Sequence, residues 1–340
     1  MSPPEGQPTG GRPTEESEAR SAITEIGAAS GLNVVAQAPR RRSRFLGYAL
    51  YLPAAFFFSL NGTVSKQLLV GGVDPLRLSQ LRVTAAFVVL FVVVLVTRPR
   101  SLRMSRSELP LILMYGVAGV AMTQWLYFVA IDRLPVGVAL LIEFTAPIMV
   151  ALWVRFAWHQ PVRDRVWGAL ALSMLGLAMV GQVWDGFSLN GIGVAAGLGA
   201  AAALAIYYLT GERAVANRDP VSLTMWGFGA ASLLWAVVAP WWSFPWEQVG
   251  AVQGSIGPLT SIPGWWLVAY MVLLGTVVPF ALVLFSLQYL SASQASVVGM
   301  AEPLMASAIA WVVLGEVLTP VQIVGGVVVL AGVLIAENSR

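Results

Sequence analysis

Long apolar stretches separated by short polar breaks run from residue 45 almost to the end of the chain. Each stretch is close to the ~20 residues that an α-helix needs to cross a bilayer core ~30 Å thick. The fold class that this pattern predicts is an all-α integral membrane protein with ten transmembrane helices. We place them at residues 46–68, 78–97, 109–131, 135–156, 166–182, 190–210, 221–240, 265–288, 292–314 and 320–336.

Residues 1–44 have a different character from the rest of the chain. They contain no sustained apolar run, several prolines near the start, and a closing basic block, RRRSR, at residues 40–44. This composition predicts a disordered tail, because it offers too little apolar surface to form a core. A signal peptide is not indicated, since no apolar core occurs near the start of the chain.

The positive charges test the helix count independently. With the N-terminus inside the cell, sixteen of the 20 Lys and Arg residues fall in segments predicted to be cytoplasmic. Arg77 and Arg133 fall in outer loops, while Lys66 and Arg82 lie within helices. Such asymmetry predicts a multi-pass protein of the cell membrane with both termini in the cytoplasm. The predicted outer loop, 241–264, and its edges carry five tryptophans, which is typical of a segment at the membrane interface.

Composition supports the membrane assignment and narrows the chemistry. Hydrophobic residues make up 57% of the chain and charged residues only 11%, against about a quarter charged in soluble domains. The net charge of +3 is small and its basic residues lie in short loops, so nucleic-acid binding is not indicated. Cysteine is absent and His159 is the single histidine, which excludes disulfides, thiolate catalysis, and cysteine or multi-histidine metal sites. The chain has no phosphate-binding loop for ATP and no hydrolase motif, so we expect no cofactor and no enzymatic activity.

An internal repeat is the strongest functional signal in the sequence. Leu134 matches Leu290 and Pro147 matches Pro303, in each case 156 positions later, and Asp74-Pro75 matches Asp219-Pro220 at an offset of 145. The chain therefore divides into two five-helix units, 45–183 and 190–337. Because five is odd, the second unit must enter the membrane in the opposite sense. Inverted repeats of this kind place a binding site near the midplane, between halves that exchange inward-open and outward-open shapes.

The end of the chain also resembles a known family. The segment AEPLMASAIAWVVLGEVLTPVQIVGGVVVLAGVLIA, residues 301–336, is similar to the closing helix pair of the EamA family in the drug/metabolite transporter superfamily. The matching features are Glu302-Pro303, Gly315-Glu316 and the glycine-spaced last helix; residues 134–180 repeat the pattern with Gln160 in place of Glu316. The resemblance covers residues 46–336 and implies a ten-helix metabolite exporter. The segment PVGVALLIEFTAP, residues 135–147, resembles the branch that exports threonine, homoserine and related amino acids.

Two acidic residues lie well within predicted helices. Glu143 is nine residues into its helix and Glu302 eleven residues into its own, so at ~1.5 Å per residue both lie roughly 12–17 Å deep. Prolines follow at 147 and 303, and they should bend or break each helix nearby. We predict that these carboxyls line a cavity, bind an amino or cationic group and carry a proton. The alternative is that interhelical hydrogen bonds hold them for packing alone. For Glu302 the two interpretations are evenly balanced. The repeat equivalent of Glu143 is Gly299 and not Glu302, so the two carboxyls need not face the same way.

Two basic side chains and several polar ones complete the candidate site. Arg82 and Lys66 lie towards the outer ends of the first two helices, where either could bind a substrate carboxylate. Lys66 fits better with a side chain that extends to the outer headgroups, and Arg82 fits both roles. Gln124, Trp125 and Tyr127 in the third helix, with Tyr207 and Tyr208 in the sixth, are candidate cavity walls.

The function that follows is secondary active transport by alternating access. We predict an exporter of small polar metabolites such as amino acids, with protons as the coupling ion and the lipid bilayer as its solvent. An importer or a facilitator of neutral solutes is the alternative within transport. A membrane enzyme and a non-transporting scaffold or sensor are the alternatives from other classes, although an enzyme has no need for the repeat. The substrate, the direction of transport and a homodimer are left open.

Overall fold

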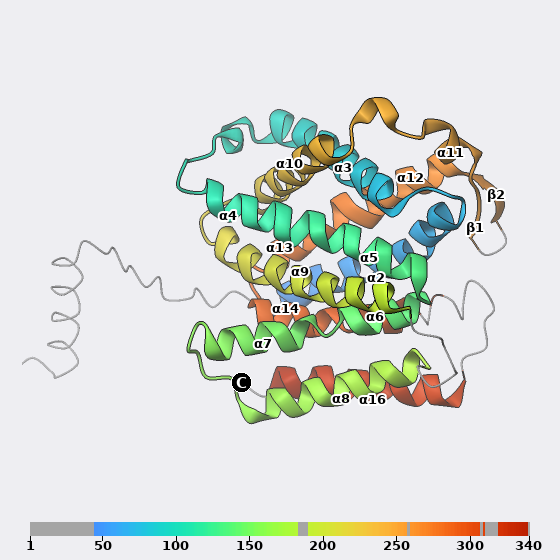
Figure 1. Ribbon diagram of the computed structural model, residues 1–340. Coiled ribbons are helices and arrows are strands. Elements are labelled where there is room, and N and C mark those ends of the chain that lie inside the picture. Colours follow the sequence, from blue (N-terminus) through green and yellow to red (C-terminus); the bar gives the residue numbers. More distant parts are fainter. Residues whose placement is uncertain (1–43, 183–189, 257–258, 307–308, 310–318, 339–340) are drawn as a thin grey trace, which may run out of the picture. The chain divides into compact units, whose positions relative to one another are not determined.

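A computed structural model of the protein describes residues 44–182, 190–256, 259–306, 309 and 319–338 (Figure 1). The predicted tail up to residue 43, the Gly315-Glu316 motif and the last part of the predicted span 292–314 lie outside these ranges. Arg44 does not belong to the tail, because the first described helix begins there.

All secondary-structure elements in the described first half of the chain are helices. These are α2 (Arg44–Val70), α3 (Pro75–Thr97), η1 (Pro99–Leu102), α4 (Leu109–Leu113), η2 (Met114–Ala121), α5 (Met122–Arg133), α6 (Val136–Glu143), α7 (Ala146–Phe156) and α8 (Asp164–Val180). Asp74 caps α3 by accepting hydrogen bonds from the amides of Leu76 and Arg77, and Pro75 occupies the first turn, where its missing N–H costs nothing.

The second half repeats this order with one longer connection. Its elements are α9 (Gly191–Val215), α10 (Pro220–Val238), η3 (Trp241–Ser243), α11 (Trp246–Ala251), β1 (Gln253–Ile256), β2 (Leu259–Pro263), α12 (Gly264–Val272), η4 (Leu273–Val277), α13 (Val278–Ser286), α14 (Ala292–Gly299) and α16 (Pro320–Asn338). Asp219 and Pro220 begin α10 as Asp74 and Pro75 begin α3, so the repeated dipeptide is a repeated helix start.

Seven spans in the described part of the chain are long and apolar enough to cross a membrane. Three further helices, α8, α14 and α16, lie at the remaining predicted positions. The predicted class, an all-α membrane fold, is therefore confirmed. The connection 241–264, predicted as an outer loop, holds a short antiparallel ribbon of β1 and β2. Three of its predicted interfacial tryptophans, Trp241, Trp246 and Trp265, stack on one another there.

The third helix of each repeat contains a π-helical turn at the same place. In the first repeat η2 lies between α4 and α5, and in the second repeat η4 lies between α12 and α13. The offset of 156 places Leu273–Val277 on residues 117–121, inside η2. Turns of this kind are rare and occur frequently at functional sites.

The fourth helix of each repeat is broken, also at equivalent positions. In the first repeat α6 ends at Glu143, a turn follows at 144–145, and α7 begins at Ala146. In the second repeat α14 ends at Gly299, a turn follows at 300–301, and the helix resumes at Glu302. The two prolines stand in the first turn of the resumed helices, so the predicted breaks near residues 147 and 303 are confirmed.

Contacts between equivalent helices show that the repeats are inverted. Thr84 of α3 hydrogen-bonds to Ser232 of α10 at 2.8 Å, and Phe87 of α3 packs where Gly229 of α10 has no side chain. The offset of 145 exchanges these two contacts, as a two-fold axis between α3 and α10 requires. The helices are antiparallel, since Arg77 reaches Pro240 at one end and Arg98 pairs with Asp219 at the other.

The fifth helices of the repeats, α8 and α16, pack in the same way (Figure 1). A Cβ added to Gly176 would lie 2.7 Å from the carbonyl oxygen of Gly325, and one added to Gly332 would lie 2.8 Å from that of Ala169. The offset of 156 exchanges these two contacts as well. The close approach of the two backbones therefore depends on small residues at matched positions, as in other membrane helix pairs.

We expect Gly176→Leu to destabilise the folded protein by ~1–3 kcal/mol, because its side chain would overlap the α16 backbone. Gly168→Leu is the matched control on the same helix, since a Cβ there has no neighbour within 4 Å. Thermal unfolding in detergent, followed by tryptophan fluorescence, measures the difference. Equal midpoints for the two variants would contradict the packing described here.

The charge distribution makes a second prediction about sidedness. Ser255 and Ser105 are both exposed, and they lie beyond opposite ends of α3: Ser255 bonds to Gln67 before that helix begins, and Ser105 follows its end. In the cysteine-free chain, Ser255→Cys should react with an impermeant thiol reagent added outside intact cells, whereas Ser105→Cys should not. The opposite pattern would reverse the predicted orientation.

Candidate functional site

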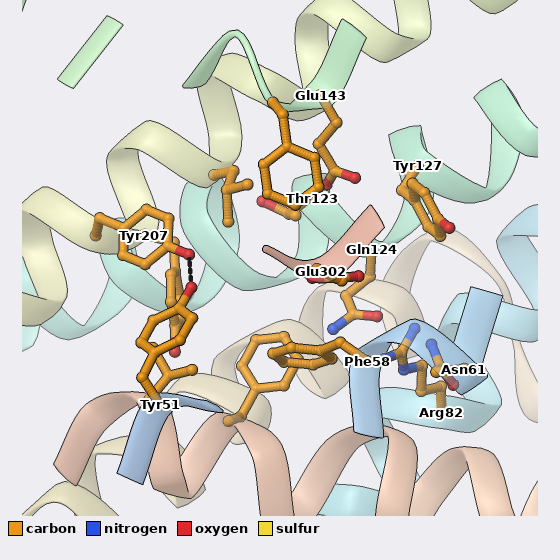
Figure 2. Close-up of a pocket in the computed structure, with 15 residues that line it drawn as sticks. Tyr51, Phe58, Asn61, Arg82, Thr123, Gln124, Tyr127, Glu143, Tyr207 and Glu302 are labelled. Atoms are coloured by element: carbon orange, nitrogen blue, oxygen red, sulfur yellow. Dashed lines mark hydrogen bonds between the residues drawn. The ribbon is translucent and has the colours of Figure 1, made fainter. Parts of the chain in front are cut away.

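A cavity of about 80 Å³ lies among the helices of both repeats (Figure 2). It is large enough to hold more than one water molecule. Its wall combines charged, amide and hydroxyl groups with aromatic rings. The lining residues are Tyr51, Phe58, Asn61, Arg82, Thr123, Gln124, Tyr127, Glu143, Phe144, Leu204, Tyr207, Tyr208, Phe280, Val283 and Glu302.

Arg82 is the buried positive charge of the cavity, and its guanidinium is held in a fixed orientation. Only 3% of the residue is exposed. Its Nε donates to Thr276 Oγ1 at 2.6 Å, and one terminal nitrogen donates to the Gly275 carbonyl at 2.7 Å. Both acceptors belong to the π-helical turn η4. With its amide oxygen turned towards the guanidinium, Asn61 accepts from both terminal nitrogens at 3.2 and 3.1 Å.

The π turn makes room for this arrangement. A Cβ on Gly275 would lie 2.2 Å from the Asn61 side chain, so only glycine allows Asn61 and the turn to approach Arg82 together. Thr276 donates its own hydroxyl proton to the Met271 carbonyl at 2.6 Å, which leaves its oxygen free to accept from Arg82. Arg82 is thus held in place by four hydrogen bonds to groups other than a carboxylate. The Arg82 Cζ atom lies 5.4 Å from the centre of the Phe128 ring, a cation–π distance.

Glu143 and Glu302 both line the cavity, although their positions in the repeats differ by three residues. Glu143 is the last residue of α6, and Glu302 is the first residue after the turn that follows α14. Within the described parts of the chain, neither carboxyl forms an ion pair; Glu302 accepts a hydrogen bond from Ser59 only through its backbone carbonyl. Figure 2 shows both carboxyls pointing into the cavity, which the Gln124 side chain also lines.

Gln124 and Tyr127 come from α5 and close one side of the cavity. The Gln124 carbonyl oxygen is buried and has no hydrogen-bond partner among the described residues, so it can accept one from a ligand. The Tyr127 hydroxyl reaches α2, where a Cβ on Gly62 would lie 2.9 Å from it. Five of the six predicted site residues, Arg82, Gln124, Tyr127, Glu143 and Glu302, therefore meet in one cavity.

Lys66 lies apart from them. Its ammonium group donates to the Ile131 carbonyl and, at 3.5 Å, to the Asp132 carbonyl at the end of α5. Trp125, which we considered as a cavity wall, instead packs against Trp235 of α10.

A pair of tyrosines crosses from one repeat to the other at one end of the cavity. The hydroxyls of Tyr51 in α2 and Tyr208 in α9 hydrogen-bond to each other, the contact drawn as a dashed line in Figure 2. Gly299, at the end of α14, leaves the space for both, since a Cβ there would lie 2.7 Å from the Tyr51 hydroxyl and 3.1 Å from that of Tyr208. Gly299 is the repeat equivalent of Glu143.

The sequence did not single out Tyr51, Asn61 or Thr276. A weak signal existed for Asn61, an amide inside an apolar span, but serines and threonines nearby in the same helix conceal it. Thr276 and Tyr51 carry no such signal, because hydroxyls are common in membrane helices and can bond to their own backbone. No group of three metal-ligating side chains occurs in the described ranges.

Comparison with known proteins agrees with this architecture. The EamA-like transporter family matches residues 45–182 and again residues 191–337. The threonine/homoserine exporter RhtA of Escherichia coli strain K12 is 32% identical over 229 residues, which are 66% of this chain and 70% of the exporter. The exporter of the same name from Salmonella typhimurium strain SL1344 is 31% identical over 237 residues, 69% of this chain and 73% of that protein.

More distant similarity extends the same picture. The uncharacterized transporter YdfC of Bacillus subtilis strain 168 is 26% identical over 263 residues, 76% of this chain and 80% of its own length. A crystal structure of another protein superposes with a TM-score of 0.68 at 17% identity, covering 87% of this chain and 98% of that one, which shows a shared fold. With the family matched over both repeats, this chain belongs to the EamA-like transporter family and is a multi-pass membrane transporter.

Proposed function

We propose that the protein exports small amino acids in exchange for protons, by alternating access between its two repeats. The observation that carries the proposal is one cavity, at the junction of both repeats, that presents two unpaired carboxyls and one fixed guanidinium. The relatives named as threonine/homoserine exporters support an amino acid as the substrate.

The charges of the cavity complement a zwitterion. A substrate carboxylate can pair with Arg82, whose planar guanidinium recognises carboxylates in a defined orientation. The substrate ammonium group can then lie between Glu143 and Glu302, with the free Gln124 oxygen as a further acceptor.

The same charges explain why protons would be the coupling ion. Two ionised carboxylates beside one guanidinium leave an excess negative charge, which is costly in a low-dielectric interior. A proton on one carboxyl and an ammonium group between both carboxyls are two alternative ways to reduce this excess. Substrate and proton therefore compete for the pair, and competition for one site is what exchange requires.

The placement of the site supports alternating access. Glu143 and Glu302 flank the breaks in the fourth helices, where the backbone is not tied by continuous helical hydrogen bonds. Broken helices at a repeat interface are the usual site of substrate binding in transporters with inverted repeats. In this proposal both termini are cytoplasmic, as the distribution of positive charge predicts.

Glu143→Gln keeps the shape and most hydrogen-bonding capacity of the side chain but cannot lose a proton. We expect this variant, in proteoliposomes, to lose uphill threonine flux driven by an imposed pH gradient by at least about ten-fold, while the folded protein remains present. Glu302→Gln is the companion variant, because the two carboxyls can titrate as a pair. Unchanged driven flux in both single variants and in the double variant would leave the carboxyls as packing groups only.

Arg82 and Lys66 provide a matched pair of charge removals. Arg82→Gln should reduce flux of zwitterionic substrates by about 100-fold, as expected when a charged hydrogen-bonding partner of ~3 kcal/mol is lost. Arg82→Lys should not restore it, because an ammonium group cannot replace the fixed planar fork. Lys66→Gln should change flux by less than about two-fold, since a partly exposed cation at a helix end contributes little. Equal, small effects of all three changes would remove Arg82 from the substrate site.

A further inference from the structure

A second cavity, of about 400 Å³, lies next to the first along α9. Its wall includes Trp158, Arg163, Glu212, Ser291 and Ser293, which come from the loop between α7 and α8, from α9 and from the start of α14. Positive charge on the surrounding loops predicts that this end of the protein faces the cytoplasm.

The two cavities follow one another along α9. Tyr208 lines the first cavity and Glu212, one helical turn further along α9, lines the second. On α2, Tyr51 and Asn61 mark two ends of the first cavity and are ten residues apart, which corresponds to ~15 Å along a helix. Tyr51 is closer to the start of α2, so the tyrosine pair stands at the end of the first cavity that faces the second.

We propose that the second cavity is the vestibule through which the amino acid reaches the central cavity, and that the Tyr51–Tyr208 hydrogen bond is the barrier between them. This inference rests on the proposed function for the identity of the passing ligand. The bond joins the first helices of the two repeats, α2 and α9. A movement that separates these helices at this end must therefore break it.

The closed tyrosine pair depends on the absence of a side chain at Gly299. The two hydroxyls meet directly beside the end of α14, at a place where any larger residue would push them apart. The position lies at the helix break, next to Glu302, so the backbone that bends at the substrate site also supports the closed tyrosine pair. The segment from Gly299 to Glu302 therefore couples occupation of the central cavity to opening of the barrier.

The test measures access by thiol labelling in the absence of substrate. Thr123→Cys reports on the central cavity and Ser293→Cys on the vestibule. The probe is a small trimethylammonium methanethiosulfonate, applied to inside-out and right-side-out vesicles whose sidedness is set by Ser255→Cys and Ser105→Cys. Ser293→Cys should label readily from the Ser105 side. Thr123→Cys should label slowly from that side.

Two different changes should open the barrier. Tyr208→Phe removes the hydrogen bond and Gly299→Ala retains both hydroxyls but separates them; each should speed labelling of Thr123→Cys from the Ser105 side by about five-fold. Labelling of Ser293→Cys should not change. Tyr270→Phe and Gly168→Ala are the controls. The Tyr270 hydroxyl donates a weak hydrogen bond to the Phe57 carbonyl, 3.5 Å away, and neither residue lines the cavity. A Cβ on Gly168 has no neighbour within 4 Å.

The outcomes separate this inference from the proposed function. Unchanged labelling of Thr123→Cys in both gate variants, or faster labelling from the Ser255 side alone, would overturn the barrier. Failure of amino-acid flux would overturn the proposed function and leave the labelling result intact, because labelling needs no transport. Slow labelling of Ser293→Cys from both sides would show that the second cavity is not a vestibule.

Discussion

A charged side chain buried in a membrane helix bundle must find its partners within the protein, and this constraint shapes the cavity of the molecule. Arg82 finds them in the carbonyl and hydroxyl of a π-helical turn and in the amide of Asn61. In the interior of a regular α-helix each carbonyl already accepts a hydrogen bond from an amide of the same helix. The irregular turn η4 and the glycine within it are therefore what allow a guanidinium to remain in this position.

The two repeats share a backbone but not a site. Where the first repeat has Arg82 the second has Gly227, and the ring of Tyr115 fills the space, 2.3 Å from where a Cβ would stand. Where the first repeat has Glu143 the second has Gly299, beside the tyrosine pair. A symmetric framework thus carries one asymmetric set of charges. Such a site can distinguish the two ends of its ligand, which a substrate with an ammonium and a carboxylate group requires.

The predictable part of this protein followed from two strong physical signals. Apolar length and loop charge located the helices, since lipid and the cytoplasmic face impose them residue by residue. Carboxyls and arginine within apolar runs located most of the cavity, because such groups are too costly to place elsewhere. Periodicity could not reveal the π turns, which insert one residue without changing composition. Nor could it reveal Tyr51 or Thr276, whose roles depend on which helix lies opposite. Lys66 carried the same charge signal as Arg82, and the structure separates them only through depth and direction.

The contacts outside the cavity indicate where a transport cycle can bend this framework. The pair α3 and α10 is joined at both ends: Arg77 donates to the Pro240 carbonyl at one end, and Arg98 pairs with Asp219 at the other. Beside that second end, Arg218 donates to Glu108 and to two backbone carbonyls of the segment that links α3 to α4. Arg218 is largely buried, so these bonds are stronger than those of an exposed ion pair. A motion that hinged between α3 and α10 would have to break one set of them. The broken fourth helices offer less resistance, because the turns after Glu143 and Gly299 already interrupt their hydrogen bonds. In the proposed cycle, movement therefore begins at the carboxyls themselves, and the α3–α10 pair serves as the fixed reference against which the cavity opens.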